Sequence, residues 1–142
     1  MAKILLVSDA EVVIDELGST LENGVHEISS AKSGESVRRI VASDAPDLVV
    51  ADCQVGNMGG IAICLDLKLE ESGGRIPPVP VLLLLDRRAD VHLARRSGAE
   101  GWLVKPFDSL RLRKAANAVL EGRSFQDESF KPVSQAAKTA GE

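Results

Sequence analysis

The chain has 142 residues, of which 44% are hydrophobic and 27% are charged, and its net charge is −4 at neutral pH. These values are typical of a soluble globular protein, and the length provides for one well-packed domain but not for two ordinary ones. No apolar run is long enough to span a membrane and no secretory signal segment precedes the first apolar run, so we expect a cytoplasmic protein that does not bind membranes.

Segments of strand and helix character alternate along most of the chain. Short apolar runs predict strands over residues 3–7, 25–29, 48–51, 81–85 and 101–104. Apolar residues at helical spacing predict helices in the intervals, and Ile61, Leu65 and Leu69 mark the third of them. This alternating order predicts a doubly wound α/β fold, in which helices cover both faces of a parallel sheet.

The last segment of the chain differs in composition from the rest. Residues 124–142 are mostly small and polar, with few large apolar side chains, so they cannot bury enough surface to hold one conformation. We therefore predict a single domain over residues 1–123, followed by a flexible polar tail over residues 124–142.

Charge is distributed unevenly along the chain. Residues 1–85 hold 13 acidic and 6 basic side chains, a net charge of −7, whereas residues 86–123 hold 9 basic and 5 acidic side chains, a net charge of +4. A basic face on an acidic body favours an acidic protein partner or a charge-complementary dimer. It disfavours direct nucleic-acid binding, because the acidic body repels the phosphate backbone. Ordinary solvated helix faces are an equally good interpretation of the same pattern.

Charged side chains follow three of the predicted strands. Asp9 follows the first strand, Asp52 the third and Lys105 the fifth. The carboxyl ends of parallel strands meet at the edge of the sheet where such folds bind ligands, and the first and third strands are neighbours in the strand order 2-1-3-4-5. Two carboxylates there favour Mg²⁺, and a carboxylate next to a lysine can attack a phosphoryl donor. Taken singly, Asp9 could cap a helix and Lys105 could be a solvated lysine.

Several motifs occur in the order and spacing of one known family. They are residues 6–9 (LVSD), 46–52 (PDLVVAD), 57–60 (NMGG), 80–81 (PV) and 98–107 (GAEGWLVKPF). The chain resembles the receiver domain of bacterial two-component response regulators over about residues 3–122. The resemblance implies a flavodoxin-like five-stranded parallel sheet in the order 2-1-3-4-5, and a signalling protein rather than an enzyme. The absence of a dinucleotide-binding or Walker motif agrees with the latter expectation.

The resemblance also implies a role for individual residues. Asp52 matches the phosphoacceptor. Asp9, Asp52 and the backbone carbonyl of Gln54 match the ligands of a weakly bound Mg²⁺. Lys105 matches the lysine that pairs with the phosphoryl group, and its bond to the following proline is expected to be cis. Trp102 occupies the position of the aromatic switch residue.

Three departures from the family pattern concern the same site. Ser8 replaces the first of two adjacent acids, which weakens the expected Mg²⁺ site. Leu85 stands where the family has a hydroxyl residue that contacts the phosphoryl group, so the usual switch contact is absent. Asp86 follows it with a negative charge, which can repel a phosphoryl group, pair with Lys105 or Arg87, or serve as a replacement metal ligand.

Two functions remain open at this point. The first is a stand-alone response regulator in a phosphorelay, phosphorylated by a histidine kinase or a phosphotransfer protein. The second is a pseudo-receiver, an interaction module with impaired or absent phosphorylation switching. In both, the resemblance places a downstream partner or homodimer contact on the fourth and fifth helices. The basic residues of that predicted surface are Arg87, Arg88, Arg95, Arg96, Arg111, Arg113 and Lys114.

Overall fold

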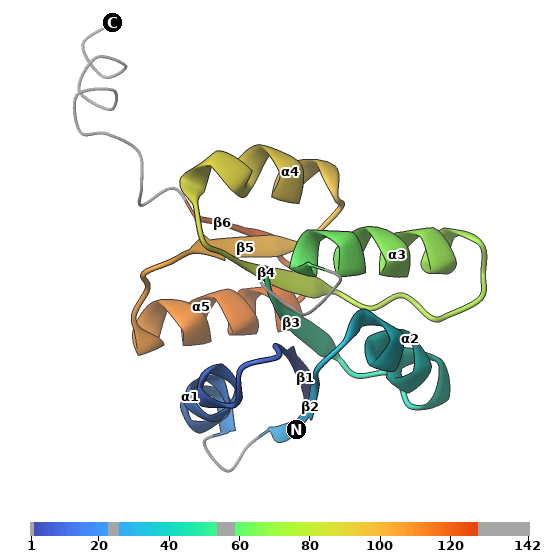
Figure 1. Ribbon diagram of the computed structural model, residues 1–142, viewed down its shortest axis with the longest axis horizontal. Helices are drawn as coiled ribbons and strands as arrows, with labels where there is room; N and C mark the ends of the chain where they lie inside the picture. Colours follow the sequence, from blue (N-terminus) through green and yellow to red (C-terminus); the bar gives the residue numbers. More distant parts are fainter. Residues whose placement is uncertain (1, 23–25, 54–58, 128–142) are drawn as a thin grey trace, which may run out of the picture.

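A six-stranded parallel sheet forms the centre of the molecule (Figure 1). The computed structural model describes residues 2–22, 26–53 and 59–127. The sheet order is β2-β1-β3-β4-β5-β6, which confirms the predicted order 2-1-3-4-5 and adds a short edge strand. The strands are β1 (Lys3–Val7), β2 (Glu27–Ala31), β3 (Leu48–Asp52), β4 (Val81–Leu85), β5 (Gly101–Val104) and β6 (Phe125–Gln126).

Helices cover both faces of the sheet, as the alternating pattern predicts (Figure 1). The helices are α1 (Glu11–Glu22), α2 (Gly34–Ser43), α3 (Gly60–Ser72), the 3-10 helix η1 (Arg88–Asp90), α4 (Val91–Arg96) and α5 (Ser109–Leu120). α1 and α5 pack on one face, and α2, α3 and α4 pack on the other. None of the helices in the described part of the chain is long and apolar enough to cross a membrane.

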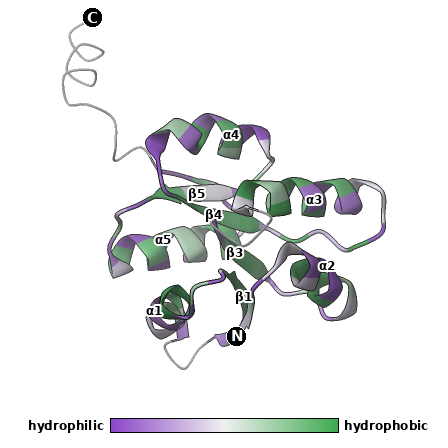
Figure 2. Ribbon diagram, viewed as in Figure 1, coloured by the Kyte–Doolittle hydropathy of each residue, from purple (hydrophilic) through white to green (hydrophobic). Residues whose placement is uncertain are grey.

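The central strands are apolar because both of their faces are covered. Every residue of β3 and β4 is buried, and alternate side chains enter the two cores. Figure 2 shows hydrophobic residues along the sheet and hydrophilic residues on the outer sides of the helices. Side-chain oxygens of Ser33 and Asp108 accept hydrogen bonds from backbone N–H groups and cap α2 and α5.

The apolar spacing that predicts α3 does not by itself identify its inward face. Ile63, Cys64 and Leu67 enter the core, whereas Leu65 and Leu69 are 51% and 62% exposed. Nearly every turn of α3 carries apolar residues on both sides, so hydrophobic spacing alone does not select one face. Contacts with β3, β4 and α4 decide the orientation instead.

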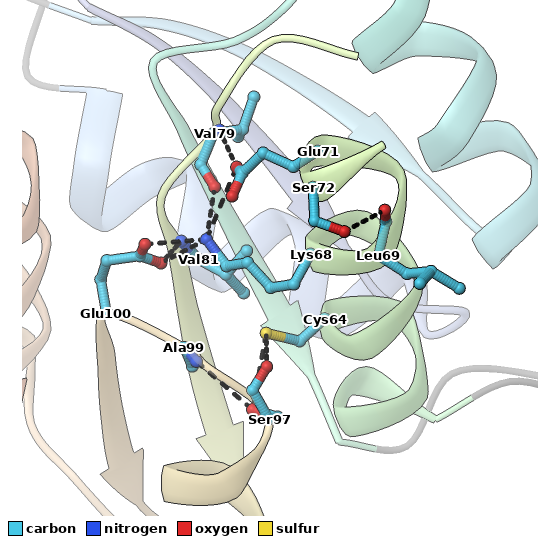
Figure 3. Close-up of polar contacts among 10 residues, drawn as sticks. All are labelled: Cys64, Lys68, Leu69, Glu71, Ser72, Val79, Val81, Ser97, Ala99 and Glu100. Carbon is cyan, nitrogen blue, oxygen red and sulfur yellow. Dashed lines mark hydrogen bonds and ion pairs between the residues drawn. The ribbon is translucent and has the colours of Figure 1, made fainter. Parts of the chain in front are cut away.

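A group of hydrogen bonds and an ion pair connects α3 to the amino-terminal ends of β4 and β5 (Figure 3). The Lys68 ammonium lies 2.7 Å from a Glu100 carboxylate oxygen and donates to the Val79 carbonyl at 3.1 Å. Glu100 also accepts a hydrogen bond from the Val81 N–H at 2.9 Å. Both members of this partly buried ion pair also make hydrogen bonds to the backbone. The contacts lie at the amino-terminal ends of the strands, opposite to the carboxyl ends where Asp52 lies.

β6 is the element that the sequence did not predict. The expected flexible tail begins at residue 124, but Phe125–Gln126 pair with β5, and the following Asp127 is buried. The start of the tail is therefore corrected for residues 125–127. Residues 128–142 lie outside the described part of the chain.

Candidate functional site

The candidate site lies where β3 and β5 end. Asp52 is the last residue of β3, and Lys105 directly follows β5. Asp52 pairs in register with Leu84, and Val104 pairs with Leu85, so β4 holds the two strand ends at neighbouring positions. The Lys105 N–H also donates to the Leu85 carbonyl at 2.8 Å. The parallel sheet thus brings together two side chains that are 53 residues apart, as the sequence predicts.

The Asp52 carboxylate is buried, and its hydrogen-bond donors among the described residues include Lys105 and Ser8. The Lys105 ammonium lies 2.7 Å from Asp52 Oδ1, and the Ser8 hydroxyl donates to Asp52 Oδ2 at 3.3 Å. Ser8 Oγ in turn accepts a hydrogen bond from the Ala10 N–H at 3.2 Å. A buried carboxylate needs such partners because removing its charge from water is costly. Ser8 therefore orients Asp52 by a hydrogen bond, where an acid at the same position would add a metal ligand.

Asp86 is a second carboxylate on the same ammonium group. Asp86 Oδ1 lies 2.9 Å from Lys105 Nζ, and both side chains are less than one-third exposed. Burial favours the neutral amine, but hydrogen bonds and attraction from Asp52 and Asp86 outweigh burial and raise the pKa of Lys105 above its ordinary value. Of the two basic partners left open for Asp86, the structure shows Lys105, whereas Arg87 pairs with Asp90.

The predicted switch residues are packed in the core. Leu85 is fully buried among residues of the sheet, α3 and α4, and Trp102 is 2% exposed in the same cluster. The guanidinium of Arg95 lies 5.6 Å from the centroid of the Trp102 ring and covers it from α4. The Trp102 indole N–H is buried without a hydrogen-bond partner in the described part of the chain. Leu85 therefore packs against apolar side chains at the position where the family pattern has a hydroxyl residue.

Cys53 follows Asp52 and is partly buried. Burial raises the pKa of the Cys53 thiol to about 11, and the nearby carboxylates of Asp90, Asp86 and Asp52 add to the effect. The thiol is therefore neutral at physiological pH and is a poor nucleophile. We therefore assign Cys53 no role in the chemistry of the site.

The donor set for a metal is small. Asp9 is exposed two residues after β1, next to the strand that ends in Asp52. Among the described residues, no group of three or more histidine, cysteine, aspartate or glutamate side chains is placed to hold a metal ion. Mg²⁺ uses one or two carboxylates and keeps several waters, so Asp9 and Asp52 fit a weak Mg²⁺ site. Gln54, the predicted source of a backbone ligand, lies outside the described residues.

The predicted basic surface is less uniform than its sequence suggests. Arg111 is partly buried and forms an ion pair with Asp127, a residue whose role the sequence did not indicate. Arg95 covers Trp102, and Arg87 pairs with Asp90. Arg87, Arg88, Arg95, Arg96 and Lys114 are all exposed, and Arg113 is partly exposed, so Arg87 and Arg95 remain accessible to solvent despite these contacts.

Comparison with known proteins places this geometry in a family. The family described as "Response regulator receiver domain" matches residues 4–117. Protein PilH of Pseudomonas aeruginosa is 30% identical over 122 residues, which cover 86% of this chain and all of PilH. Response regulator PleD of Caulobacter vibrioides is 33% identical over 111 residues, and the match covers 78% of this chain but only 24% of PleD.

Solved structures agree with the sequence relatives. The signal receiver domain of a signal transduction histidine kinase from Syntrophus aciditrophicus has a TM-score of 0.76 and 26% identity, covering 86% of this chain and 92% of the other. The chemotaxis protein CheY4 of Vibrio cholerae has a TM-score of 0.71 and 26% identity, covering 84% of this chain and 98% of the other. The similarity therefore extends over the sheet and the helices that surround the candidate site.

Proposed function

The chain belongs to the response regulator receiver family, and on that basis we propose that it is a stand-alone response regulator whose Asp52 accepts a phosphoryl group. Receiver domains are signalling modules of phosphorelays rather than classical enzymes. The observation that carries the proposal is the buried Asp52 carboxylate, 2.7 Å from the Lys105 ammonium at the carboxyl edge of the sheet. The match covers all of PilH but only 24% of PleD.

The proposed reaction is a phosphoryl transfer to the Asp52 carboxylate. A bond forms between a carboxylate oxygen and phosphorus, the bond from phosphorus to the donor breaks, and the leaving group keeps the electron pair. Lys105 neutralises charge on the phosphoryl oxygens, and Ser8 holds the acceptor carboxylate in place. Asp9, Asp52 and the Gln54 carbonyl would hold Mg²⁺ weakly, and the ion would supply further neutralisation of phosphoryl charge.

The donor and the partners follow from the same proposal. A phosphohistidine of a histidine kinase or a phosphotransfer protein supplies the phosphoryl group. The exposed basic residues Arg88, Arg96 and Lys114 favour an acidic downstream protein or a homodimer through α4 and α5. The net charge of −4 opposes direct nucleic-acid binding. We infer that the protein acts in the cytoplasm.

Phosphorylation of Asp52 is tested with a small-molecule phosphodonor. The full chain is incubated with acetyl phosphate and Mg²⁺, and the intact mass is measured over time. One added phosphoryl group is expected in the wild type and in Asp44→Asn, a control that removes an exposed carboxylate paired with Lys3. The added mass is expected to be absent in Asp52→Asn. Equal labelling of Asp52→Asn and the wild type would contradict the assignment.

A pseudo-receiver is the second candidate, and two observations favour it. Lys105 is already paired with Asp86, and the buried Leu85 has no hydroxyl with which to report a phosphoryl group. In that case partner binding would be the same with and without acetyl phosphate. An absence of added mass in the wild type would support this candidate over the first.

A further inference from the structure

The chain returns to its own sheet after α5. Phe125 pairs with Gly101 and Gln126 pairs with Trp102, so β6 extends the sheet in parallel along the free edge of β5. The Phe125 N–H donates to the Glu100 carbonyl at 3.1 Å. A ladder of two residues is weak by itself, so the segment needs side-chain contacts to stay in place.

Asp127 supplies the strongest of these contacts. Its side chain is 0% exposed, and both of its oxygens are engaged. Asp127 Oδ2 accepts a hydrogen bond from the Val104 N–H at 2.8 Å, and Oδ1 lies 2.6 Å from Arg111 Nη2. The same Arg111 guanidinium lies 5.7 Å from the centroid of the Phe125 ring. One arginine therefore contacts both an aromatic ring and a carboxylate two residues further on.

The surface that binds this segment is formed by β5 and α5. A Cβ atom on Gly101 would lie 3.0 Å from the Phe125 carbonyl oxygen, so a glycine there lets the second backbone approach. Val104 on β5 offers its N–H, and Arg111 on α5 offers its guanidinium. The Arg111 Nε–H is buried and has no hydrogen-bond partner among the described residues.

We propose that the β5 edge and Arg111 form a binding site for an extended acidic peptide of a partner protein, and that Phe125–Asp127 occupies this site in cis. The peptide carries an aromatic residue and, two positions later, a carboxylate. Strand addition takes affinity from backbone hydrogen bonds and specificity from alternate side chains, which is the arrangement seen for Phe125 and Asp127. The net charge of +4 over residues 86–123 favours an acidic ligand.

A partner peptide must compete with the segment Phe125–Asp127, which is tethered to the same chain. Gly122, at a φ of +83°, turns the chain between α5 and β6, and only four residues separate the two elements. A tether this short gives the segment an effective concentration on the order of millimolar, so a separate peptide competes poorly until the segment is released. The site is thus closed in the free protein and opens by displacement of residues 125–127. Phosphorylation of Asp52 is not required for the proposal.

Peptide binding to a variant with the segment released tests the proposal. The probe is the synthetic peptide Ser-Phe-Gln-Asp-Glu, and the host is the full chain carrying Asp127→Ala. Binding is measured by calorimetry, and hydrogen exchange of the Val104 amide reports release of the segment. We expect the variant to bind the peptide about tenfold or more tightly than the wild type, because a charge-assisted hydrogen bond becomes available.

Two further variants make the result specific. Adding Arg111→Ala to Asp127→Ala is expected to abolish binding, whereas adding Asn117→Ala, an exposed and uncharged α5 residue outside the contact, is expected to leave it unchanged. A probe with asparagine in place of aspartate is expected to bind about tenfold more weakly. If Asp127→Ala fails to fold, Phe125→Ala provides the released host.

Three outcomes would overturn the proposal. The first is a Val104 amide that stays protected in Asp127→Ala, because Asp127 would then not anchor the segment. The second is a released segment without peptide binding. The third is a wild-type dimer that Arg111→Ala abolishes, because the site would then belong to a second copy of the chain rather than to a partner peptide.

Discussion

Replacement of Asp86 tests how the resident ion pair affects phosphorylation of Asp52. The change is Asp86→Asn, which keeps the shape of the side chain and removes its charge. Lys105 Nζ lies 2.9 Å from Asp86 and 2.7 Å from Asp52, so an incoming phosphoryl group competes with Asp86 for the ammonium. A hydrogen bond between charged groups contributes about 1.5–3 kcal/mol net. Recovery of about 1.5 kcal/mol in the transition state predicts phosphorylation about tenfold faster in the variant.

The assay follows the intact mass of the protein with acetyl phosphate and Mg²⁺ over time. Asp90→Asn is the matched control, because the Asp90 carboxylate lies near the same strand end but pairs with Arg87. Its rate is expected to equal that of the wild type at physiological salt. Equal rates for Asp86→Asn and the wild type would refute the reasoning, since Asp86 would then not compete for Lys105. Acceleration by both variants would instead indicate a general effect of negative charge.

Three other changes have defined outcomes. Ser8→Asp adds a carboxylate beside Asp52 and is expected to tighten Mg²⁺ binding, measured by titration of Trp102 fluorescence; an unchanged affinity would contradict a metal site here. Leu85→Thr combined with Asp86→Ala supplies a hydroxyl and removes a carboxylate, so acetyl phosphate is expected to change Trp102 fluorescence more than in the wild type, and a full response in the wild type would argue against Leu85 as the missing switch. Cys53, with a thiol pKa of about 11 against an ordinary 9.0, is expected to alkylate about a hundredfold more slowly at pH 8 than in the unfolded chain, and equal rates would show that the thiol is not buried.

The pairing of Asp52 with Lys105 could be predicted from the sequence because it depends on the fold alone. Residues 48–51 and 81–85 are continuous apolar runs, which is typical of strands covered on both faces. Once the strands are parallel, the residues that follow them meet at one edge, whatever their separation along the chain. The ligand edge of the sheet is thus encoded by short segments that are each readable in isolation.

The partner of Asp86 and the inward face of α3 depended on packing. Two basic residues could have paired with Asp86. Arg87 is next to it in the sequence, and Lys105 follows the neighbouring strand. The structure pairs it with Lys105 because the end of β4 lies beside the end of β5. In α3, Leu65 is exposed although it fits a helical apolar stripe, because the helix offers a second stripe that packs better.

β6 could not be predicted because neither of its partners lies nearby in the sequence. Composition indicates a solvated segment, and a two-residue strand has no periodicity to detect. The contact exists because Arg111 and the Val104 N–H, on different elements, converge on one carboxylate. An acid two residues after an aromatic residue, just beyond the helix that ends at Leu120 and the turn at Gly122, is the only local signal. A buried, fully paired carboxylate in such a segment is costly to desolvate and costly to leave unpaired, so Asp127 fixes the register of β6 more strongly than the backbone ladder does.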